Sequence, residues 1–467
     1  MIDESIIREY DIRGVYNETL TKESAYLIGW SFSQYIKKHS EFKTDIVNVC
    51  RDGRLSSPAL CAYLIKGLRD GGINVENMGV GPTPLLYYST FVRQVDAGIM
   101  ITGSHNPSGY NGFKFIFNQN PFFGDHIKEL YEISKQYKKS SIKNSKRGEI
   151  RHVSFIDDYV KMLIETCQID KELKVAWDPG NGAASEVAER LCSNLVGSHY
   201  IINEKIDGRF PAHHPDPTVK ENLKQLIDLV YEKRCDFGIA FDGDGDRIGV
   251  VDKFGRIIWG DQLLIILAKD VLSRNKGAPI IADVKASKVF FDEIRKYGGE
   301  PVMWKTGHSN IKQHMKDINC PLAGEMSGHI FIADQYFGYD DALYAAVRLI
   351  KLLANSDKAL YEIINDLPHM YSTPEIRIAC EDSVKFKIIE NISDKMRRAR
   401  KDFISIDGVR YDFDNGWWLL RASNTQPALV CRIEATSQES IKREFVVLQK
   451  LLSGEKVHLG DGHLVVD

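Results

Sequence analysis

The chain has 467 residues, of which 43% are hydrophobic and 27% are charged, and its formal net charge is −3. One hydrophobic core rarely grows beyond about 250–300 residues, so we expect three or four domains. The charge balance provides no basic stripe, and we therefore expect no nucleic acid among the partners. The eight cysteines are scattered without a CxxC pair, which indicates free thiols in a reducing compartment.

The N-terminal stretch MIDESIIREYDIRG has acidic residues where a signal peptide would have a basic and then an apolar segment. The most apolar run, LLIILA at 263–268, is far shorter than the roughly 20 residues that cross a bilayer. We therefore expect a cytoplasmic protein without a membrane partner.

Strand-like runs alternate with helical patterns through the first three quarters of the chain. In chain order these segments are 45–50, 58–72, 97–102, 173–182, 184–194, 237–252, 278–287, 288–299 and 300–307. The repetition predicts open α/β sheets with helices on their faces. Beyond this part, segments 375–382 and 408–436 predict an antiparallel sheet with helices, which is a smaller α+β domain. We place the domains at 1–150, 151–254, 255–367 and 368–467.

The segment DGDGDR joins two strand-like runs, FGIAF and IGVV. Its alternating glycines let Asp242, Asp244 and Asp246 point at one spot. Carboxylates so close raise one another's pKa, and a divalent cation removes this conflict. A site with few protein ligands, which leaves room for a phosphate oxygen, suits Mg²⁺. An EF-hand is excluded because its sixth and twelfth positions hold Arg247 and Lys253. The alternative is an acidic turn of solvated side chains.

The segment ITGSHNPSGYNGFK, residues 101–114, is too rich in Gly and Pro for a helix or a strand interior. It places Ser104 on a stiff loop directly after the apolar run AGIMI, a common position for catalytic groups in α/β sheets. The pattern GxSxG is absent, which disfavours an acyl-transfer hydrolase. A phosphoserine here would give the metal of the aspartate loop a fourth anionic ligand. The alternative is a polar surface turn.

Four motifs resemble those of the α-D-phosphohexomutase superfamily, and within it the bacterial phosphomannomutase/phosphoglucomutase group. They are TGSHNPSGYNGFK as the catalytic serine loop, DGDGDR as the metal loop, GEMSGH at 324–329 as the sugar-recognition loop and RASNTQP at 421–427 as the phosphate-binding loop. Their order and their spread over nearly the whole chain make the resemblance specific. It implies four domains around a central cleft, namely three related mixed α/β domains and a smaller C-terminal α+β domain.

The resemblance also implies a phosphohexomutase that interconverts hexose 1-phosphate and hexose 6-phosphate, of mannose, glucose or both. The reaction would proceed through a phosphoserine and a hexose 1,6-bisphosphate, which also serves as activator. Catalytic roles are implied for Ser104, Arg13, Lys114, Arg247 and His329. The implied Mg²⁺ ligands are Ser104, Asp242, Asp244 and Asp246. A lysine that moves protons needs a lowered pKa, which we expect for Lys114 from a crowded cationic cleft.

Contacts with the sugar phosphate are implied for Lys285, His308, Glu325, Ser327, Arg421, Ser423, Asn424 and Thr425. A carboxylate at Glu325 that accepts hydroxyls 3 and 4 would leave carbon 2 unread and would admit both glucose and mannose. His213 and His214 resemble a metal-binding pair, but we interpret them as loop structure.

Two other enzyme functions remain open. A phosphoglucosamine mutase would resemble GEQSGH, from which Met326 departs. A Mg²⁺-dependent sugar-phosphate phosphatase would use the same serine and aspartates, but a second phosphate-binding loop favours the mutase. A sugar-phosphate sensor without catalysis would have lost Ser104 or the aspartates, and neither is lost. The resemblance leads us to expect a monomer or a weak dimer.

Overall fold

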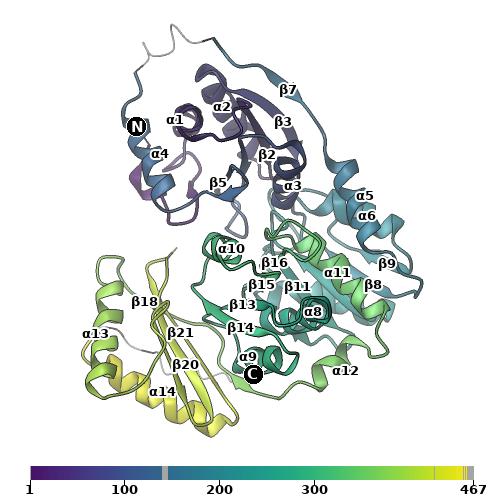
Figure 1. Cartoon of the computed structure of the whole chain (residues 1–467), viewed down its shortest axis with the longest axis vertical. Helices are drawn as coiled ribbons and strands as arrows, with labels where there is room; N and C mark the ends of the chain where they lie inside the picture. Colours follow the sequence, from purple (N-terminus) through teal and green to yellow (C-terminus); the bar gives the residue numbers. More distant parts are fainter. Residues whose placement is uncertain (1, 139–145, 425, 456, 458, 460–467) are drawn as a thin grey trace.

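The computed structural model describes residues 2–138, 146–424, 426–455, 457 and 459. Its strands form four sheets, which follow one another along the chain. In Figure 1 the sheets lie along an arc, from the first at the top through the second and third to the fourth at the lower left. This architecture confirms the predicted fold class of three mixed α/β domains followed by an α+β domain.

The first sheet has the order β1-β5-β4-β2-β3-β7, with β6 paired to β5. Strands β4, β2, β3 and β7 are parallel, whereas β5 runs antiparallel to β4 and to β1. The strands are β1 (Ile12–Val15), β2 (Ile46–Arg51), β3 (Asn74–Val80), β4 (Ala97–Ile101), β5 (Tyr110–Phe117), β6 (Asn120–Pro121) and β7 (Ile150–His152). The helices are η1 (Glu4–Ile6), α1 (Lys22–His39), α2 (Ser57–Asp70), α3 (Thr83–Arg93) and α4 (Asp125–Lys135).

The second and third sheets repeat this plan with fewer strands. Their orders are β12-β11-β10-β8-β9 and β14-β13-β15-β16. The strands are β8 (Lys174–Asp178), β9 (Ser198–Ile201), β10 (Phe237–Phe241), β11 (Ile248–Asp252), β12 (Ile257–Ile258), β13 (Pro279–Asp283), β14 (Glu300–Trp304), β15 (Leu322–Gly324) and β16 (Ile330–Ile332). The helices are α5 (Ile156–Thr166), α6 (Ser185–Asn194), η3 (Lys220–Leu223), α7 (Lys224–Lys233), α8 (Gly260–Arg274), α9 (Lys288–Lys296), α10 (His308–Asp317), α11 (Ala342–Ala354) and α12 (Leu360–Asn365).

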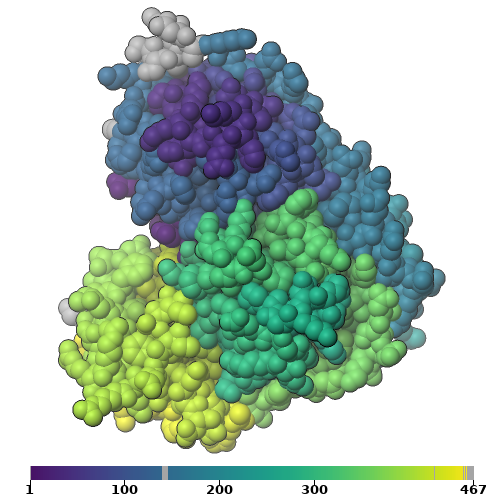
Figure 2. Space-filling view, viewed as in Figure 1, coloured from purple at the N-terminus to yellow at the C-terminus, as the bar shows by residue number. Residues whose placement is uncertain are grey.

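The fourth sheet is antiparallel, with the order β17-β21-β20-β19 and with β18 also paired to β21. Its strands are β17 (Tyr371–Ser372), β18 (Ile376–Ala379), β19 (Val409–Phe413), β20 (Gly416–Ala422) and β21 (Ala428–Ala435), and its helices are α13 (Lys385–Arg398) and α14 (Gln438–Leu452). The space-filling view shows this domain in yellow-green, beside the teal and green third domain. In the same view (Figure 2) the purple and blue first domain lies above the third, at the top of the molecule.

The first three sheets share one feature that positions the site. In each, a central parallel strand is followed by a strand that returns antiparallel beside it: β4 by β5, β10 by β11, and β15 by β16. The three connecting loops hold the serine motif, the aspartate motif and the GEMSGH motif. Functional loops of α/β sheets commonly follow the carboxyl ends of parallel strands in this way. The RASNTQP motif lies where β20 turns into β21.

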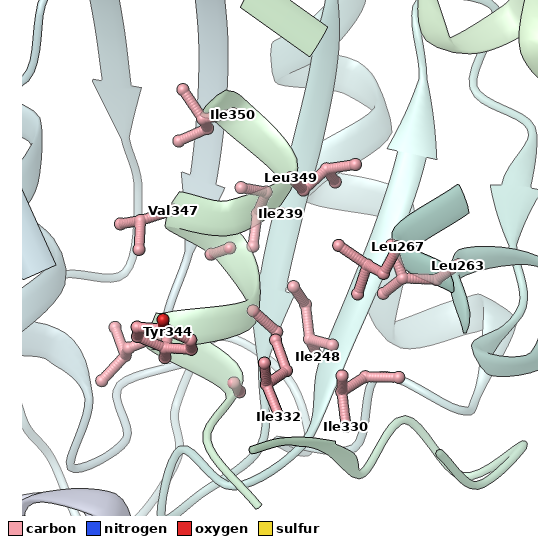
Figure 3. Packing of buried hydrophobic residues seen from close by; sticks show 14 of the residues in the cluster. Ile239, Ile248, Leu263, Leu267, Ile330, Ile332, Tyr344, Val347, Leu349 and Ile350 are labelled. Carbon is pink, nitrogen blue, oxygen red and sulfur yellow. The ribbon is translucent and has the colours of Figure 1, made fainter. Parts of the chain in front are cut away.

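The largest buried core extends from the first domain through the second into the third. Figure 3 shows Ile239 of β10 and Ile248 of β11 beside Ile330 and Ile332 of β16, with Val347 of α11 close by. Burial of each such side chain stabilises the fold by about 1.5–3 kcal/mol. All eight cysteines are free. None of the described helices combines the length and the apolar character that crossing a bilayer requires.

The shared core predicts that shortening Ile239, which is fully buried, destabilises the second and third domains together. We expect Ile239→Ala to lower the free energy of unfolding by about 2–5 kcal/mol, because the removed atoms leave a cavity. Urea unfolding followed by tryptophan fluorescence measures the change. The control is Val196→Ala, at a side chain that is 45% exposed. Equal unfolding midpoints for the two variants would contradict the shared core.

Candidate active site

The serine loop is held by one buried arginine that sequence reasoning missed. The guanidinium of Arg54 is fully buried and donates to four backbone carbonyls of the loop. They are those of Ser104 at 2.7 Å, Asn106 at 2.6 Å, Pro107 at 2.6 Å and Tyr110 at 3.1 Å. Five N–H donors in one planar group allow this set of bonds, which a lysine could not make.

Asp52 fixes that arginine and the start of the loop together. Its Oδ2 accepts hydrogen bonds from Arg54 Nε at 3.1 Å, Thr102 Oγ1 at 2.9 Å and the Gly103 amide at 3.2 Å. Ser104 follows with a φ of +48°, a conformation that side-chain-bearing residues seldom adopt. A strained backbone conformation persists only where surrounding contacts hold it in place, and Asp52 and Arg54 supply such contacts.

The serine hydroxyl meets the aspartate loop across the boundary between the first and second domains. Ser104 is 1% exposed, and its Oγ donates to Asp242 Oδ2 at 3.0 Å. The approach depends on Gly243, because a Cβ there would lie 2.6 Å from the Ser104 carbonyl oxygen. The threonine at the start of α3 adds a second link, since Thr83 Oγ1 donates to Asp244 Oδ2 at 2.5 Å.

The three predicted metal ligands of the aspartate loop converge. Asp242, Asp244 and Asp246 are fully buried, and one oxygen of each lies within 4.8 Å of the others. Two of these carboxylates also contact Lys114 Nζ, Asp244 at 2.7 Å and Asp246 at 2.5 Å. Lys114 stands on β5, opposite Met100 of β4, so the same antiparallel pair carries both the serine loop and this lysine.

Charge in this cluster is not balanced by the protein alone. Burial, together with the charges of Asp244 and Asp246, raises the pKa of Asp242 well above its usual value. The Oδ1 atoms of Asp244 and Asp246 are buried and have no hydrogen-bond partner within the described parts of the chain. Hard oxygen donors that face one another in this way suit a Mg²⁺-like cation, so the residues present fit the metal that the sequence predicted.

The expected lowering of the Lys114 pKa is wrong in this arrangement. Burial alone would lower it, but the charges of Asp244 and Asp246 outweigh burial, and the pKa of Lys114 is raised above its usual value. The expectation assumed neighbouring cations, whereas the structure surrounds the ammonium group with carboxylates. In this arrangement Lys114 is a fixed cation.

Further cationic and imidazole groups surround the serine and aspartate loops. Arg247 Nε donates to His329 Nε2 at 3.0 Å, and His329 Nδ1 lies 3.1 Å from Asp340 Oδ2. The acceptor role of Nε2 leaves Nδ1 to carry the ring proton. The ring of His308 stacks on that of His329 with centroids 5.5 Å apart. Asp246, His329 and Asp340 form a second group whose ligand atoms lie within 4.8 Å of one another.

Arg13 and His105 contact the serine loop directly. Arg13 Nη1 donates to Asn106 Oδ1 at 3.1 Å and also pairs with Asp11. His105 Nδ1 lies 3.2 Å from Ser104 Oγ. Burial, and then the charges of Arg247 and Arg13, lower the pKa of His105 well below its usual value. The imidazole beside the serine is therefore neutral.

The predicted sugar loop lies in the third domain, close to Lys285. Glu325 Oε1 accepts from the Gly307 amide at 2.5 Å, and Ser327 Oγ donates to Oε2 at 2.9 Å. Burial alone would lower the pKa of Lys285, but Glu375, Asp283 and Glu325 together raise it. Glu325 thus keeps one oxygen on the backbone and the other on a rotatable hydroxyl, which a sugar hydroxyl can replace.

The predicted phosphate loop approaches the first and third domains through Tyr10. The amides of Asn424 and Asn310 donate to the Tyr10 oxygen at 2.7 and 3.2 Å, and Tyr10 donates to the Thr306 carbonyl at 3.0 Å. Arg421 Nε donates to Asp407 Oδ2 at 3.0 Å, which leaves its Nη groups for other acceptors. Thr425 lies outside the described residues.

Ser423 belongs to the same turn, where its amide donates to the Ala428 carbonyl at 2.9 Å and its Oγ accepts from the Gln426 amide at 3.2 Å. His213 pairs with Asp178 at 2.9 Å, in agreement with its interpretation as loop structure. Tyr10, Arg54 and Asp340 escaped sequence reasoning. The motif EYDIRG contains Tyr10, and a charged pair in RDGR, directly after an apolar strand, was the available signal for Arg54.

A buried hydroxyl beside three carboxylates, together with a second, arginine-bearing turn, defines an enzyme of phosphoryl transfer. Comparison with known proteins agrees. Family models for phosphoglucomutase/phosphomannomutase match in order: α/β/α domain I at 4–141, domain II at 155–255, domain III at 259–371 and the C-terminal domain at 375–450. The chain belongs to the phosphoglucomutase/phosphomannomutase family of the α-D-phosphohexomutase superfamily, which confirms the resemblance.

Two curated relatives are similar over almost their whole length. A phosphomannomutase/phosphoglucomutase of Pseudomonas syringae pv. tomato is 44% identical over 95% of this chain and 94% of its own. A phosphoglucomutase of Neisseria meningitidis is 41% identical over 95% of each. Among solved structures, a phosphoglucomutase/phosphomannomutase family protein of Burkholderia thailandensis has a TM-score of 0.88 at 38% identity, over 97% of this chain and 98% of that one. An Aspergillus fumigatus N-acetylphosphoglucosamine mutase, 14% identical with a TM-score of 0.55, shares the fold.

The contacts of Arg54 predict that its shape, and not only its charge, supports activity. We expect Arg54→Lys to lower turnover about tenfold or more, because a displaced serine loop loses near-attack geometry. The apparent KM should change much less, since the substrate-facing loops are untouched. Steady-state kinetics on folded protein measures both values, and Arg190→Lys at an exposed ion pair on α6 is the control. Wild-type turnover in R54K would show that the four hydrogen bonds from Arg54 to the loop carbonyls are not needed for activity.

Proposed function

We propose that this chain is a phosphohexomutase that interconverts the 1-phosphate and 6-phosphate of mannose, glucose or both. The observation that supports this proposal most directly is the contact of Ser104 Oγ with the buried aspartate trio. A hydroxyl in this position can accept and return a phosphoryl group, and the trio supplies a site for the cation that such a transfer requires.

In the proposed reaction Ser104 carries a phosphoryl group in the resting enzyme. The bond between phosphorus and the serine oxygen breaks as a bond forms to the free hydroxyl of the hexose phosphate, and a hexose 1,6-bisphosphate results. After the sugar reorients, its other phosphate returns to Ser104. The same bisphosphate would phosphorylate the unmodified serine and so act as activator.

The aspartate trio, with the serine phosphate, would hold Mg²⁺. When bound, Mg²⁺ supplies positive charge to the transferring phosphoryl group and to the serine oxygen that leaves. Lys114 and Arg247 add fixed positive charge at the same point, and Arg13 holds the loop through Asn106. Because these groups lie in a buried region of low dielectric, their charges act strongly on the transferred group.

The sugar hydroxyl that attacks must lose its proton. His329 is the group that we propose for this task, because its ring is buried beside Arg247 and Asp340, close to the metal loop. His308, stacked on His329, and Lys285 would contact the substrate. An imidazole can take a proton and later return it, which a reversible mutase needs.

The far phosphate would bind the turn between β20 and β21. The Arg421 Nη groups have no hydrogen-bond partner among the described residues, and the Ser423 hydroxyl lies on the same turn. Asn424 is joined to Tyr10, which also bonds to Thr306 of the third domain. Glu325 and Ser327 would accept two neighbouring sugar hydroxyls in either orientation of the ring. Recognition of hydroxyls 3 and 4 involves no contact with the group on carbon 2. This supports action on both glucose and mannose.

Replacing the proposed nucleophile tests this function. We expect Ser104→Ala to lower the conversion of glucose 1-phosphate to glucose 6-phosphate by about three orders of magnitude or more, because no oxygen remains to carry the phosphoryl group. A coupled assay with Mg²⁺ and glucose 1,6-bisphosphate measures the rate.

The matched control is Ser193→Ala, at an exposed serine of α6 whose hydroxyl bonds only to the Glu189 carbonyl among the described residues. Mutase activity in S104A equal to that of the control would overturn the nucleophile. Inorganic phosphate as the main product of the wild type would overturn the mutase reaction in favour of a phosphatase.

A further inference from the structure

A groove on the first domain, outside the site described above, collects positive charge. One wall is a face of helix α2 that carries Cys61, Ile65 and Arg69, spaced by four positions, with Lys66 beside them. The opposite wall comes from β2, β3, β7 and the segment before β7. Figure 1 shows α2 packed against this sheet. We call this cavity the basic groove, and its volume is about 400 Å³.

Four cationic side chains line the basic groove, namely Arg51, Lys66, Arg69 and Arg147, and its lining contains no carboxylate. Arg147 pairs with Asp70 at 3.0 Å on the rim. The other three form no ion pair with any described carboxylate. The whole chain carries a net charge of −3, so this concentration of positive charge is local. Like charges repel across the groove, and a bound anion would relieve that repulsion.

Backbone contacts hold two of the arginines while leaving donors free. Arg69 Nε donates to the Gly148 carbonyl at 2.9 Å, and Arg51 Nη1 reaches the Asp52 carbonyl at 3.4 Å. Among the described residues, Lys66 has a long cation–π contact, 5.7 Å from the centre of the Tyr26 ring, and no hydrogen bond or ion pair. The remaining guanidinium N–H groups can bind phosphate oxygens in a forked geometry.

Part of the lining of the groove is apolar. Cys61 and Ile65 are buried there, and Ile150 is half-buried beside Arg147. A volume near 400 Å³ falls within the range of about 300–1,000 Å³ that is typical of small-molecule sites. Three cations that form no ion pair with a described carboxylate, next to apolar side chains, match a small molecule that joins at least two negative charges to a flat ring.

We propose that the basic groove is a second, non-catalytic binding site for a small organic phosphate with two or more negative charges. The site shares no residue with the serine, aspartate, sugar or phosphate loops. It therefore stands independently of the proposed mutase reaction, and a failure of one does not imply a failure of the other.

Isothermal titration with ADP as probe, without Mg²⁺, tests the site. ADP carries a diphosphate and a flat aromatic ring, whereas adenosine keeps the ring without the charge. We expect the wild type to bind ADP at this groove more weakly as salt rises, because exposed charges are screened. Adenosine alone should not bind measurably.

Three variants locate the binding. The double substitution Lys66→Glu/Arg69→Glu should weaken ADP binding about tenfold or more, since two attractive charges become repulsive. Lys387→Glu/Arg398→Glu, the same charge change on exposed positions of α13, should leave it unaltered. Arg421→Ala, in the proposed phosphate loop, should also leave it unaltered. Thermal unfolding of each variant confirms that it is folded.

An absence of ADP binding to the wild type would overturn the proposal. So would binding that is lost in R421A but kept in K66E/R69E, because ADP would then occupy the proposed active site. Equal weakening by K66E/R69E and by the α13 control would attribute the binding to overall charge and would also overturn it. Weakening by K66E/R69E alone supports the groove.

Discussion

Three carboxylates buried together are the constraint on which the rest of the structure depends. Asp242, Asp244 and Asp246 are fully removed from solvent, and charges so placed are costly unless they are compensated. Part of the compensation comes from outside their own domain, because Lys114 of the first domain contacts Asp244 and Asp246. Thr83 and Ser104, also of the first domain, donate hydrogen bonds to Asp244 and Asp242, and these contacts together bring the serine hydroxyl to the metal loop. Gly243 permits this approach by leaving room for the serine backbone.

A repeated architecture makes the convergence possible. In each α/β domain the functional loop connects a parallel strand to the antiparallel strand beside it, so three loops of different chemistry occupy equivalent positions. The fourth domain adds a hairpin turn, and Tyr10 ties this turn to the first and third domains through Asn424 and Thr306. A continuous core across the three α/β domains fixes their loops relative to one another. Transfer of a phosphoryl group between two ends of one sugar requires such fixed spacing between distant loops.

The sequence predicted the chemically active residues of the loops better than the residues that hold the loops in place. Ser104 and the aspartate trio could be recognised because each motif is local and its residue types have few other uses. Arg54 could not be placed, because its carbonyl acceptors lie fifty or more residues away and carry no side-chain signature. The pKa of Lys114 was predicted in the wrong direction for a related reason, since its carboxylate partners are 130 and 132 residues further along the chain. The fold class followed from alternating patterns, whereas the core shared by three domains depends on packing that no short segment reveals.

The central claim is that the buried trio and Ser104 act together to move a phosphoryl group. The most direct measurement is a single-turnover experiment with enzyme labelled at Ser104 by radioactive phosphate and then mixed with glucose 1-phosphate. The account predicts that the label passes to glucose 1,6-bisphosphate when Mg²⁺ is present and stays on the protein when Mg²⁺ is removed or when Asp244 is replaced by asparagine. Rapid transfer without a divalent cation, or release of the label as inorganic phosphate, would contradict it.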